Sequence, residues 1–284
     1  MHALSAPKIA RRSSRAVVVA LFAVSFALPG ATAQGAARSP SAVSRITAPS
    51  FVALDVASGR VLLARRETVR RPIASLTKVM TGLVVIERGA LGARVAVTPA
   101  AIHVEDYREG LVAWGRYRRM TLLRSALMVS ANDSATALAI DAGGGSLGRF
   151  YALMNEHARS IGMTGTTYAS ASGLDDVRNL STALDQAVLA RVALRNATFA
   201  SIVGTARYVT RWPAPTYRKV WVNHNKMLTG APGTYGVKTG WTTRAGGCLV
   251  VAQHRGGRAV IGVVLGSQSI WSDMRALLAA AFST

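Results

Sequence analysis

The chain has 284 residues and carries 34 lysine and arginine side chains against 13 aspartate and glutamate side chains, a formal net charge of +21. Half of its residues are hydrophobic, which excludes a disordered polyelectrolyte and is enough to bury a core at this length. The single cysteine, Cys248, excludes an internal disulfide framework and a cysteine-rich zinc module. The charge is also typical of nucleic-acid-binding proteins, so the motifs have to decide between that class and others.

Most of the basic residues are arginine, a bias that a GC-rich genome would supply without any anionic partner. Because lysine is rare, a motif that requires lysine is less frequent here by chance. The five lysines are Lys8, Lys78, Lys219, Lys226 and Lys238.

The first 33 residues have the order of a secretory signal peptide. A basic stretch, 8–15, precedes an apolar run, 16–28, and the small residues Ala31-Thr32-Ala33 follow. The run is short for a membrane span, which needs about 20 residues, and an uncleaved anchor is the alternative. Cleavage after Ala33 would lower the net charge from +21 to +17. We therefore expect a mature protein in the periplasm or the extracellular cell-wall space.

Residues 34–50 are rich in alanine, serine, proline and arginine, and we expect them to form a flexible leader. Apolar runs at 51–56 and 60–64 flank Ala57-Ser58-Gly59 and predict a β-hairpin. From Ser75 to Glu87 apolar residues recur at helical spacing. Further helical patterns fill the middle of the chain, at 120–128, 133–142, 147–161 and 182–194.

From Gly236 short apolar runs return and predict three strands, at 236–242, 247–253 and 258–266, with a tight turn at Gly256-Gly257. Residues 272–282 predict a closing helix that packs against the sheet. Strands at both ends with helices between them indicate an α+β fold with one antiparallel sheet and an inserted helical domain. We expect one unit over 51–284, with its sheet region at 51–90 and 205–284 and its helical region at 91–204.

Ser75 and Lys78 lie at i and i+3, on one face of the predicted helix. Serine is a poor nucleophile at neutral pH unless a base lies beside it, and a lysine whose pKa is lowered can be that base. Ser75 could equally be only the helix N-cap. The pair alone is weak, since Ser5-Ala6-Pro7-Lys8 has the same spacing.

Two further motifs offer polar groups at breaks in the pattern. Ser130-Ala131-Asn132 brings a second hydroxyl, which could relay a proton, and an amide, although Asn132 alone reads more simply as a helix cap. Lys238-Thr239-Gly240 lies in a predicted strand and offers a charge, a hydroxyl and room for a substrate backbone. This triplet is rare by chance and is the most informative of the three.

Together these motifs form the set Ser-x-x-Lys, Ser-x-Asn and Lys-Thr-Gly. With its flanking residues the chain resembles the D-alanyl-D-alanine carboxypeptidase family, the low-molecular-mass penicillin-binding proteins, from about residue 45 to 282. The resemblance implies a β-lactamase/transpeptidase-like fold. The stretches that carry it are 71–81, 130–133, 172–176, 181–185, 223–228 and 236–242.

The resemblance implies a serine peptidase without a cofactor that removes the terminal D-alanine from peptidoglycan stem peptides and is acylated by β-lactams. Ser75 would be the nucleophile, Lys78 its general base and Ser130 the group that passes a proton to the leaving D-alanine. The backbone N–H groups of Ser75 and Trp241 would form the oxyanion hole. The residues that would bind substrate are Asn132, Lys238, Thr239, Gly240, Trp241 and His224.

Some positions depart from the family pattern. Ala169-Ser170-Ala171 stands where relatives often have Asn-Pro, and Ala131 stands where Gly is common. His224 occupies a position at which some relatives carry Arg, which leaves its role open. The chain has no Glu in a Glu-x-x-Leu-Asn context, the feature that β-lactamases use for deacylation, so we expect a β-lactam to remain bound to Ser75.

Several alternatives stay open at this point. The same residues would serve an endopeptidase or a transpeptidase acting on cross-links, and a catalytically silent wall-binding protein could use the cleft for recognition only. The histidines show no ligand spacing, so we expect no metal. Cys248 reads as a buried small hydrophobe. We expect no nucleic-acid partner and at most peripheral membrane contact, with the arginine-rich stretches 65–71 and 116–119 as solvated faces.

Overall fold

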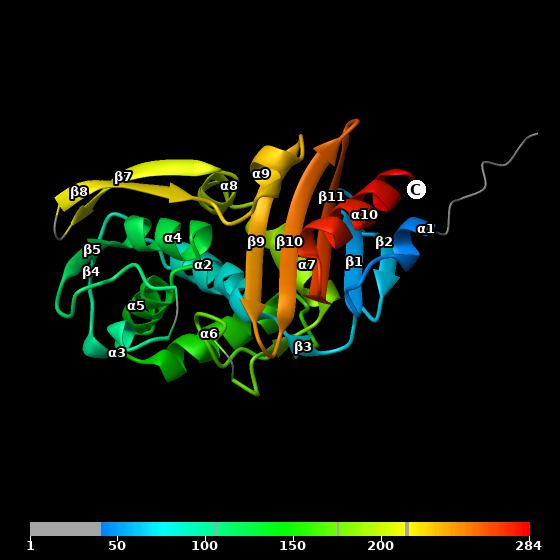
Figure 1. Ribbon diagram of the computed structural model, residues 1–284. Coiled ribbons are helices and arrows are strands. Elements are labelled where there is room, and N and C mark those ends of the chain that lie inside the picture. The colour runs from blue at the N-terminus through cyan, green and yellow to red at the C-terminus, as the bar shows by residue number, and fades with distance from the viewer. Residues whose placement is uncertain (1–40, 106, 175, 214–215) are drawn as a thin grey trace, which may run out of the picture. The chain divides into compact units, whose positions relative to one another are not determined.

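The computed structural model describes residues 41–105, 107–174, 176–213 and 216–284. Its centre is a five-stranded sheet in which all neighbouring strands are antiparallel (Figure 1). This confirms the predicted α+β fold with one sheet built from both ends of the described chain. In sheet order the strands are β2 (Val61–Arg65), β1 (Ser50–Asp55), β11 (Arg258–Ser267), β10 (Gly246–Arg255) and β9 (Thr234–Thr242).

The turn between β10 and β11 explains how these two strands pair. Gly256 and Gly257 have φ angles of 57° and 77°, and two successive positive φ values define the turn whose twist suits a two-residue hairpin. Arg255 and Arg258 pair across it. The predicted hairpin and its turn are therefore confirmed.

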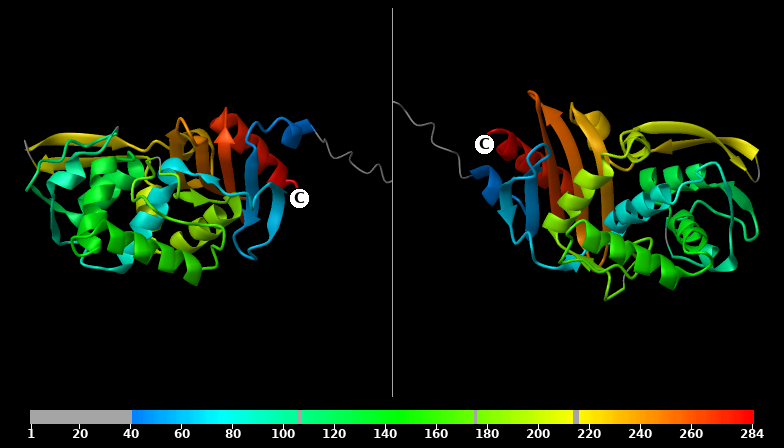
Figure 2. Two further views of the ribbon diagram at one scale, coloured as in Figure 1. Left: turned by 90° about the horizontal axis from the view of Figure 1, so that it is seen from below. Right: turned by 180° about the vertical axis from the view of Figure 1, so that it is seen from behind.

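Both faces of the sheet are apolar, because side chains alternate along each strand. One face packs on α10 (Ile270–Phe282), where Leu249 and Val251 join Met274 and Leu278 in one buried cluster. This confirms the expected packing of the closing helix. The other face packs on the helical region, which includes α7 (Ala183–Ala193) (Figure 2).

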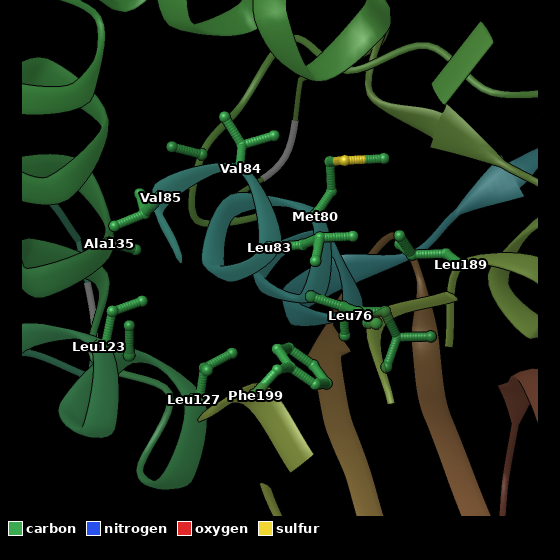
Figure 3. Packing of buried hydrophobic residues seen from close by; sticks show 14 of the residues in the cluster. Leu76, Met80, Leu83, Val84, Val85, Leu123, Leu127, Ala135, Leu189 and Phe199 are labelled. Atoms are coloured by element: carbon green, nitrogen blue, oxygen red, sulfur yellow. The ribbon is translucent and has the colours of Figure 1, made fainter. Parts of the chain in front are cut away.

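The helix that follows the predicted nucleophile is buried on every side. In α2 (Thr77–Glu87) all residues from Thr77 to Ile86 are buried, as expected for a helix that is apolar all round. Leu76, which directly precedes α2, and Met80 and Leu83 within it belong to one buried cluster with side chains of the neighbouring helices (Figure 3). These helices are α4 (Arg119–Met128), α5 (Asn132–Ala142), α6 (Leu147–Ser160), α7 and α8 (Ala197–Val203).

Outside the central sheet the described chain also contains short strands that the periodicity did not predict. A two-stranded ribbon joins β4 (Arg94–Ala96) to β5 (Arg116–Arg118), and β3 (Arg71–Pro72) pairs with β6 (Leu180–Ser181). A longer hairpin, β7 (Arg207–Pro213) and β8 (Thr216–Val222), forms a sheet of its own and lies over α4 (Figure 1). The remaining helices are α1 (Ser41–Ser44), α3 (Pro99–Ile102) and α9 (Met227–Gly230).

The expectation of a flexible leader is wrong for its last residues, because Ile46 and Ala48 are buried. The carboxylate of Asp273, at the start of α10, accepts hydrogen bonds from the backbone N–H groups of Thr47 and Ala48 and from the Thr47 hydroxyl. It also accepts one from the Ser267 hydroxyl. A buried carboxylate is destabilising unless donors such as these hydrogen-bond to it, and the hydrogen bonds hold the residues before β1 in place.

Residues 1–33, the predicted signal peptide, lie outside the described residues. Within the described ranges no helix is both long and apolar enough to cross a membrane.

Candidate active site

Ser75 sits in a short 3-10 turn, η1 (Ala74–Leu76), that leads into α2. No side chain caps either segment, so the interpretation of Ser75 as a helix cap is wrong. Ala74 has a φ of 47°, a left-handed conformation that costs a residue with a side chain about 1–2 kcal/mol. The buried neighbours Ile73 and Leu76 anchor this turn, which leaves the half-buried Ser75 facing the cleft.

Two glycines let other segments approach this turn closely. A Cβ on Gly240 would lie 2.9 Å from the backbone nitrogen of Ser75, and one on Gly173 would lie 1.9 Å from the carbonyl oxygen of Ala74. Neither position accepts a larger residue without a backbone shift. The glycines therefore allow β9 and the 172–174 segment to clamp the strained turn.

Lys78 is buried and has three polar neighbours. Its Nζ lies 2.9 Å from Ser75 Oγ, 2.7 Å from Asn132 Oδ1 and 2.6 Å from the carbonyl oxygen of Ser172. The amide and carbonyl oxygens can only accept hydrogen bonds, whereas the serine hydroxyl can also donate one. A neutral amine has two N–H groups and one lone pair, so this set of partners suits an amine that accepts the Ser75 proton.

The charges around Lys78 favour that neutral amine. Burial lowers the pKa of Lys78 well below its ordinary value, and the charge of Lys238 lowers it further, while Asp133 opposes the shift. Burial also lowers the pKa of Lys238 to about 7. The pKa of His224 is lowered by burial and by both lysines. One cleft thus combines a hydroxyl, an amine that loses its proton readily and a second cation.

Ser130 occupies the sharp turn between α4 and α5, with a φ of 64°. Asn132 is the first residue of α5 and does not cap it, so the reading of Asn132 as a cap is wrong. Its side-chain amide donates to the carbonyl oxygen of Glu105, while its backbone N–H donates to that of Tyr107. Asn132 therefore joins Lys78 to the segment that carries Tyr107.

The cleft has three walls, which are the turn of Ser75, the turn of Ser130 and β9. Of these, β9 is an edge strand of the five-stranded sheet. Among the described strands it pairs only with β10, so its outer edge faces the cleft without a strand partner. Lys238 is buried, whereas Trp241 is 67% exposed. An unpaired strand edge is a template on which an extended peptide can be bound.

A pocket opens where the three walls meet. Of the predicted site residues, Ser75, Ser130 and four others line it, while Lys78, Asn132 and Lys238 lie buried behind them. The full lining is Ser75, Tyr107, Ser130, His224, Thr239, Gly240, Trp241, Ile270 and Trp271.

Four contributors were not predicted from the sequence: Tyr107, Ile270, Trp271 and the carbonyl of Ser172. Tyr107 packs edge-on against His224, with ring centroids 6.0 Å apart. Trp271 directly precedes the predicted closing helix. An aromatic residue at that position was the available sequence signal for a contribution to the cleft. No group of metal-ligating residues occurs within the described part of the chain.

An α+β fold in which a serine hydroxyl meets a buried lysine amine at the end of an antiparallel sheet defines the penicillin-binding class of protein. The chain belongs to the D-alanyl-D-alanine carboxypeptidase family, whose model matches residues 34–269. The resemblance stated from the motifs is therefore confirmed.

Individual relatives are named for different activities. A D-alanyl-D-alanine carboxypeptidase of Mycobacterium tuberculosis is 35% identical over 75% of this chain and 73% of its own length. A D-alanyl-D-alanine endopeptidase of Escherichia coli is 30% identical over 81% of this chain and 74% of its own. The crystal structure of a Streptomyces DD-transpeptidase superposes with a TM-score of 0.79 at 30% identity, covering 84% of this chain and 98% of that one.

Proposed function

We propose that this protein is a serine-type D-alanyl-D-alanine carboxypeptidase that removes the terminal D-alanine from peptidoglycan stem peptides through an acyl-enzyme on Ser75. The observation that carries the proposal is the position of the buried Lys78 amine, 2.9 Å from Ser75 Oγ. Membership of the carboxypeptidase family supports the substrate class.

In the acylation step Ser75 Oγ attacks the carbonyl carbon of the penultimate D-alanine, and the neutral Lys78 amine takes the hydroxyl proton. The carbonyl oxygen becomes an oxyanion that the backbone N–H groups of Ser75 and Trp241 would stabilise. The closeness of Gly240 to the Ser75 nitrogen supports this pairing of turn and strand.

Collapse of the intermediate breaks the peptide C–N bond, and the departing nitrogen needs a proton. The Ser130 hydroxyl lines the same pocket and would deliver one, with the proton on Lys78 replacing it. Water then attacks the ester, its C–O bond to Ser75 breaks, and Ser75 regains its proton. The products are free D-alanine and a peptide one residue shorter.

Lys238 and Thr239 would bind the terminal carboxylate of the peptide. Burial lowers the pKa of Lys238 to about 7, and a carboxylate beside it would favour the protonated form. The half-buried His224 would lie beside the same carboxylate.

The test combines labelling by a fluorescent penicillin with release of D-alanine from a pentapeptide. Wild type is expected to do both, and Ser75→Ala neither, while the exposed-site control Ser201→Ala behaves as wild type. Lys78→Arg should also abolish labelling, because a guanidinium does not lose its proton. The exposed Lys226→Arg is its control. Labelling that survives in Ser75→Ala contradicts the assignment.

Endopeptidase and transpeptidase activities are the second candidate, supported by the activities for which the Escherichia coli and Streptomyces relatives are named. They would use the same acyl-enzyme with a cross-linked donor or an amine acceptor. Chromatography of products from cross-linked peptides separates the reactions. Labelling by penicillin without release of D-alanine would favour these activities or a silent wall-binding protein.

We infer further that residues 1–33 are a signal peptide and that the enzyme acts in the cell envelope, where its substrate is found. The basic and apolar order of these residues supports this. Export should yield a protein that begins at Gln34, which N-terminal sequencing of the exported form would detect. An N-terminus at Met1 in that form would contradict cleavage.

A further inference from the structure

The two faces of the β7–β8 hairpin differ sharply. Its register pairs Tyr208 with Trp221 and Trp212 with Tyr217, which places these four residues on one face. The Tyr208 and Trp221 rings stack at 6.1 Å, and Trp212 packs on Trp221 at 5.7 Å. This inner face covers α4 and carries the buried aromatic residues (Figures 1 and 2).

The opposite side, here named the outer hairpin face, alternates arginine with valine. The register makes Val209 and Val220 direct cross-strand neighbours and sets Arg207 opposite Val222. Val209 is 41% exposed and Val222 is 62% exposed. The outer hairpin face consists of Arg207, Val209, Arg211, Arg218, Val220 and Val222.

Among the residues that the structure describes, no carboxylate pairs with the charges of this face. Arg211 and Arg218 lie directly opposite each other, an arrangement of like charges that destabilises a strand pair. Among the described residues none of the three arginines forms an ion pair. The nearby carboxylate of Glu109 instead accepts hydrogen bonds from Trp221 and Lys219, which belong to the inner face. An anion bound outside would relieve the repulsion.

The exposed valines distinguish an anionic lipid surface from a hydrated polyanion as the partner of this face. A hydrated polyanion would contact only the arginines. Exposed β-branched apolar side chains are instead stabilised when they enter the boundary between lipid headgroups and acyl chains. Arginine side chains can bury their stems there and keep the guanidinium at the phosphates. We propose that the outer hairpin face docks on an anionic lipid bilayer.

The hairpin is suited to hold the enzyme at a fixed position on such a surface. Its inner face is packed against the body of the protein, and β8 ends two residues before His224 in the cleft. The His224 backbone N–H donates to the carbonyl oxygen of Met128 at the end of α4. Docking through this hairpin would therefore set the distance of the cleft from the membrane.

Sedimentation with phospholipid vesicles tests this docking, using the chain from residue 34 because residues Ser39–Thr284 form a compact unit. Wild type should bind vesicles containing phosphatidylglycerol and not pure phosphatidylcholine vesicles. Replacing Arg207, Arg211 and Arg218 by Gln should lower the partition coefficient by about tenfold or more. The control removes the same charge from exposed sites elsewhere, Arg159, Arg255 and Arg275, and should change it by less than about threefold.

A second pair of variants tests the apolar contribution at constant charge. Val209→Thr with Val222→Thr keeps β-branched residues in the strands and should lower binding by about threefold or more. The exposed Val69→Thr with Val177→Thr is its control and should have no effect. Labelling by penicillin should be unchanged in all four variants, which verifies that they fold.

Two results would overturn the proposal. If the control arginine set loses as much binding as the hairpin set, the attraction comes from the net charge of the protein and not from this face. If the valine variant binds vesicles as wild type does while soluble poly(glycerol phosphate) binds through the same arginines, the face recognises a wall polyanion.

Discussion

Lys78 and Lys238 are both at most 1% exposed, and neither forms a salt bridge among the described residues. An isolated ammonium is expensive to bury, and two of them near each other are more so. Burial, and after it the charge of Lys238, lowers the pKa of Lys78 well below its ordinary value. This shift favours the neutral amine, which can act as a base. Lys238 has a pKa of about 7 and can still be protonated when a carboxylate arrives.

The first prediction concerns the pH dependence of acylation. In wild type the rate constant for acylation by penicillin should rise with pH as Lys78 loses its proton, and should fall above about pH 7 as Lys238 does. In Lys238→Gln the charge that lowers the pKa of Lys78 is gone, so the rising limb should move to higher pH and the falling limb should vanish. Stopped-flow labelling measures both limbs, with the exposed Lys226→Gln as control. An unchanged profile in Lys238→Gln contradicts this account.

The second prediction concerns the contact between β9 and the turn of Ser75. In Gly240→Ala the new Cβ would lie 2.9 Å from the Ser75 nitrogen and 3.2 Å from the Ala74 Cβ, so the turn that carries Ser75 must move. A displacement of this kind should lower the acylation rate constant by about 100-fold. Gly230→Ala is the matched control, because its Cβ would meet nothing within 4 Å. Equal rates in the two variants would show that the close approach has no role in catalysis.

The first turn of α5 holds the segment that forms one rim of the cleft. The buried carboxylate of Asp133 accepts hydrogen bonds from the backbone N–H groups of Glu109, Gly110 and Leu111. The Glu109 side chain then binds the inner face of the β7–β8 hairpin. The rim that carries Tyr107 is thus tied both to α5 in the helix bundle and to the hairpin.

The third prediction follows from the two roles of Asp133. Asp133→Asn should lower the free energy of unfolding by about 1–3 kcal/mol, because charge-assisted hydrogen bonds are replaced by weaker ones. The charge of Asp133 raises the pKa of Lys78, so its loss should move the rising limb of acylation to lower pH. This shift is opposite in sign to the one expected for Lys238→Gln. Urea unfolding and the labelling profile measure the two effects.

A control for Asp133→Asn is Asp55→Asn, since Asp55 also accepts hydrogen bonds but pairs with Arg258 far from the cleft. It should lower stability without shifting the labelling profile. A shift in both variants, or in neither, would contradict the electrostatic role of Asp133.

For the whole molecule, the sequence predicted the sheet and the cleft because both depend on local patterns. Alternation and turn residues predict β9 to β11, and the spacing of Ser75 and Lys78 places both on one face of a helix. The Ser172 carbonyl could not be predicted, because every residue has one and only the fold selects which one meets Lys78.

The sequence pattern does not predict the β7–β8 hairpin, for a related reason. Its inner face alternates aromatic residues with Thr210 and Lys219, and its outer face alternates valine with arginine, so neither face is uniformly apolar. Lys219 becomes recognisable as an inner residue only when its 2.6 Å contact with Glu109 is seen. The composition of the leader before β1 likewise predicts flexibility, because its donors to Asp273 are mostly backbone N–H groups, which every sequence has.

The most direct test of the central claim is to map the penicillin adduct by mass spectrometry of the intact and the digested protein. We predict one penicilloyl group per chain, on the peptide that contains Ser75, and a slow loss of the adduct because the chain lacks the glutamate motif that β-lactamases use. Ser75→Ala should carry none. An adduct on Ser130 or any other residue, or a folded protein that forms no adduct, would contradict the assignment of Ser75 and Lys78 as nucleophile and base.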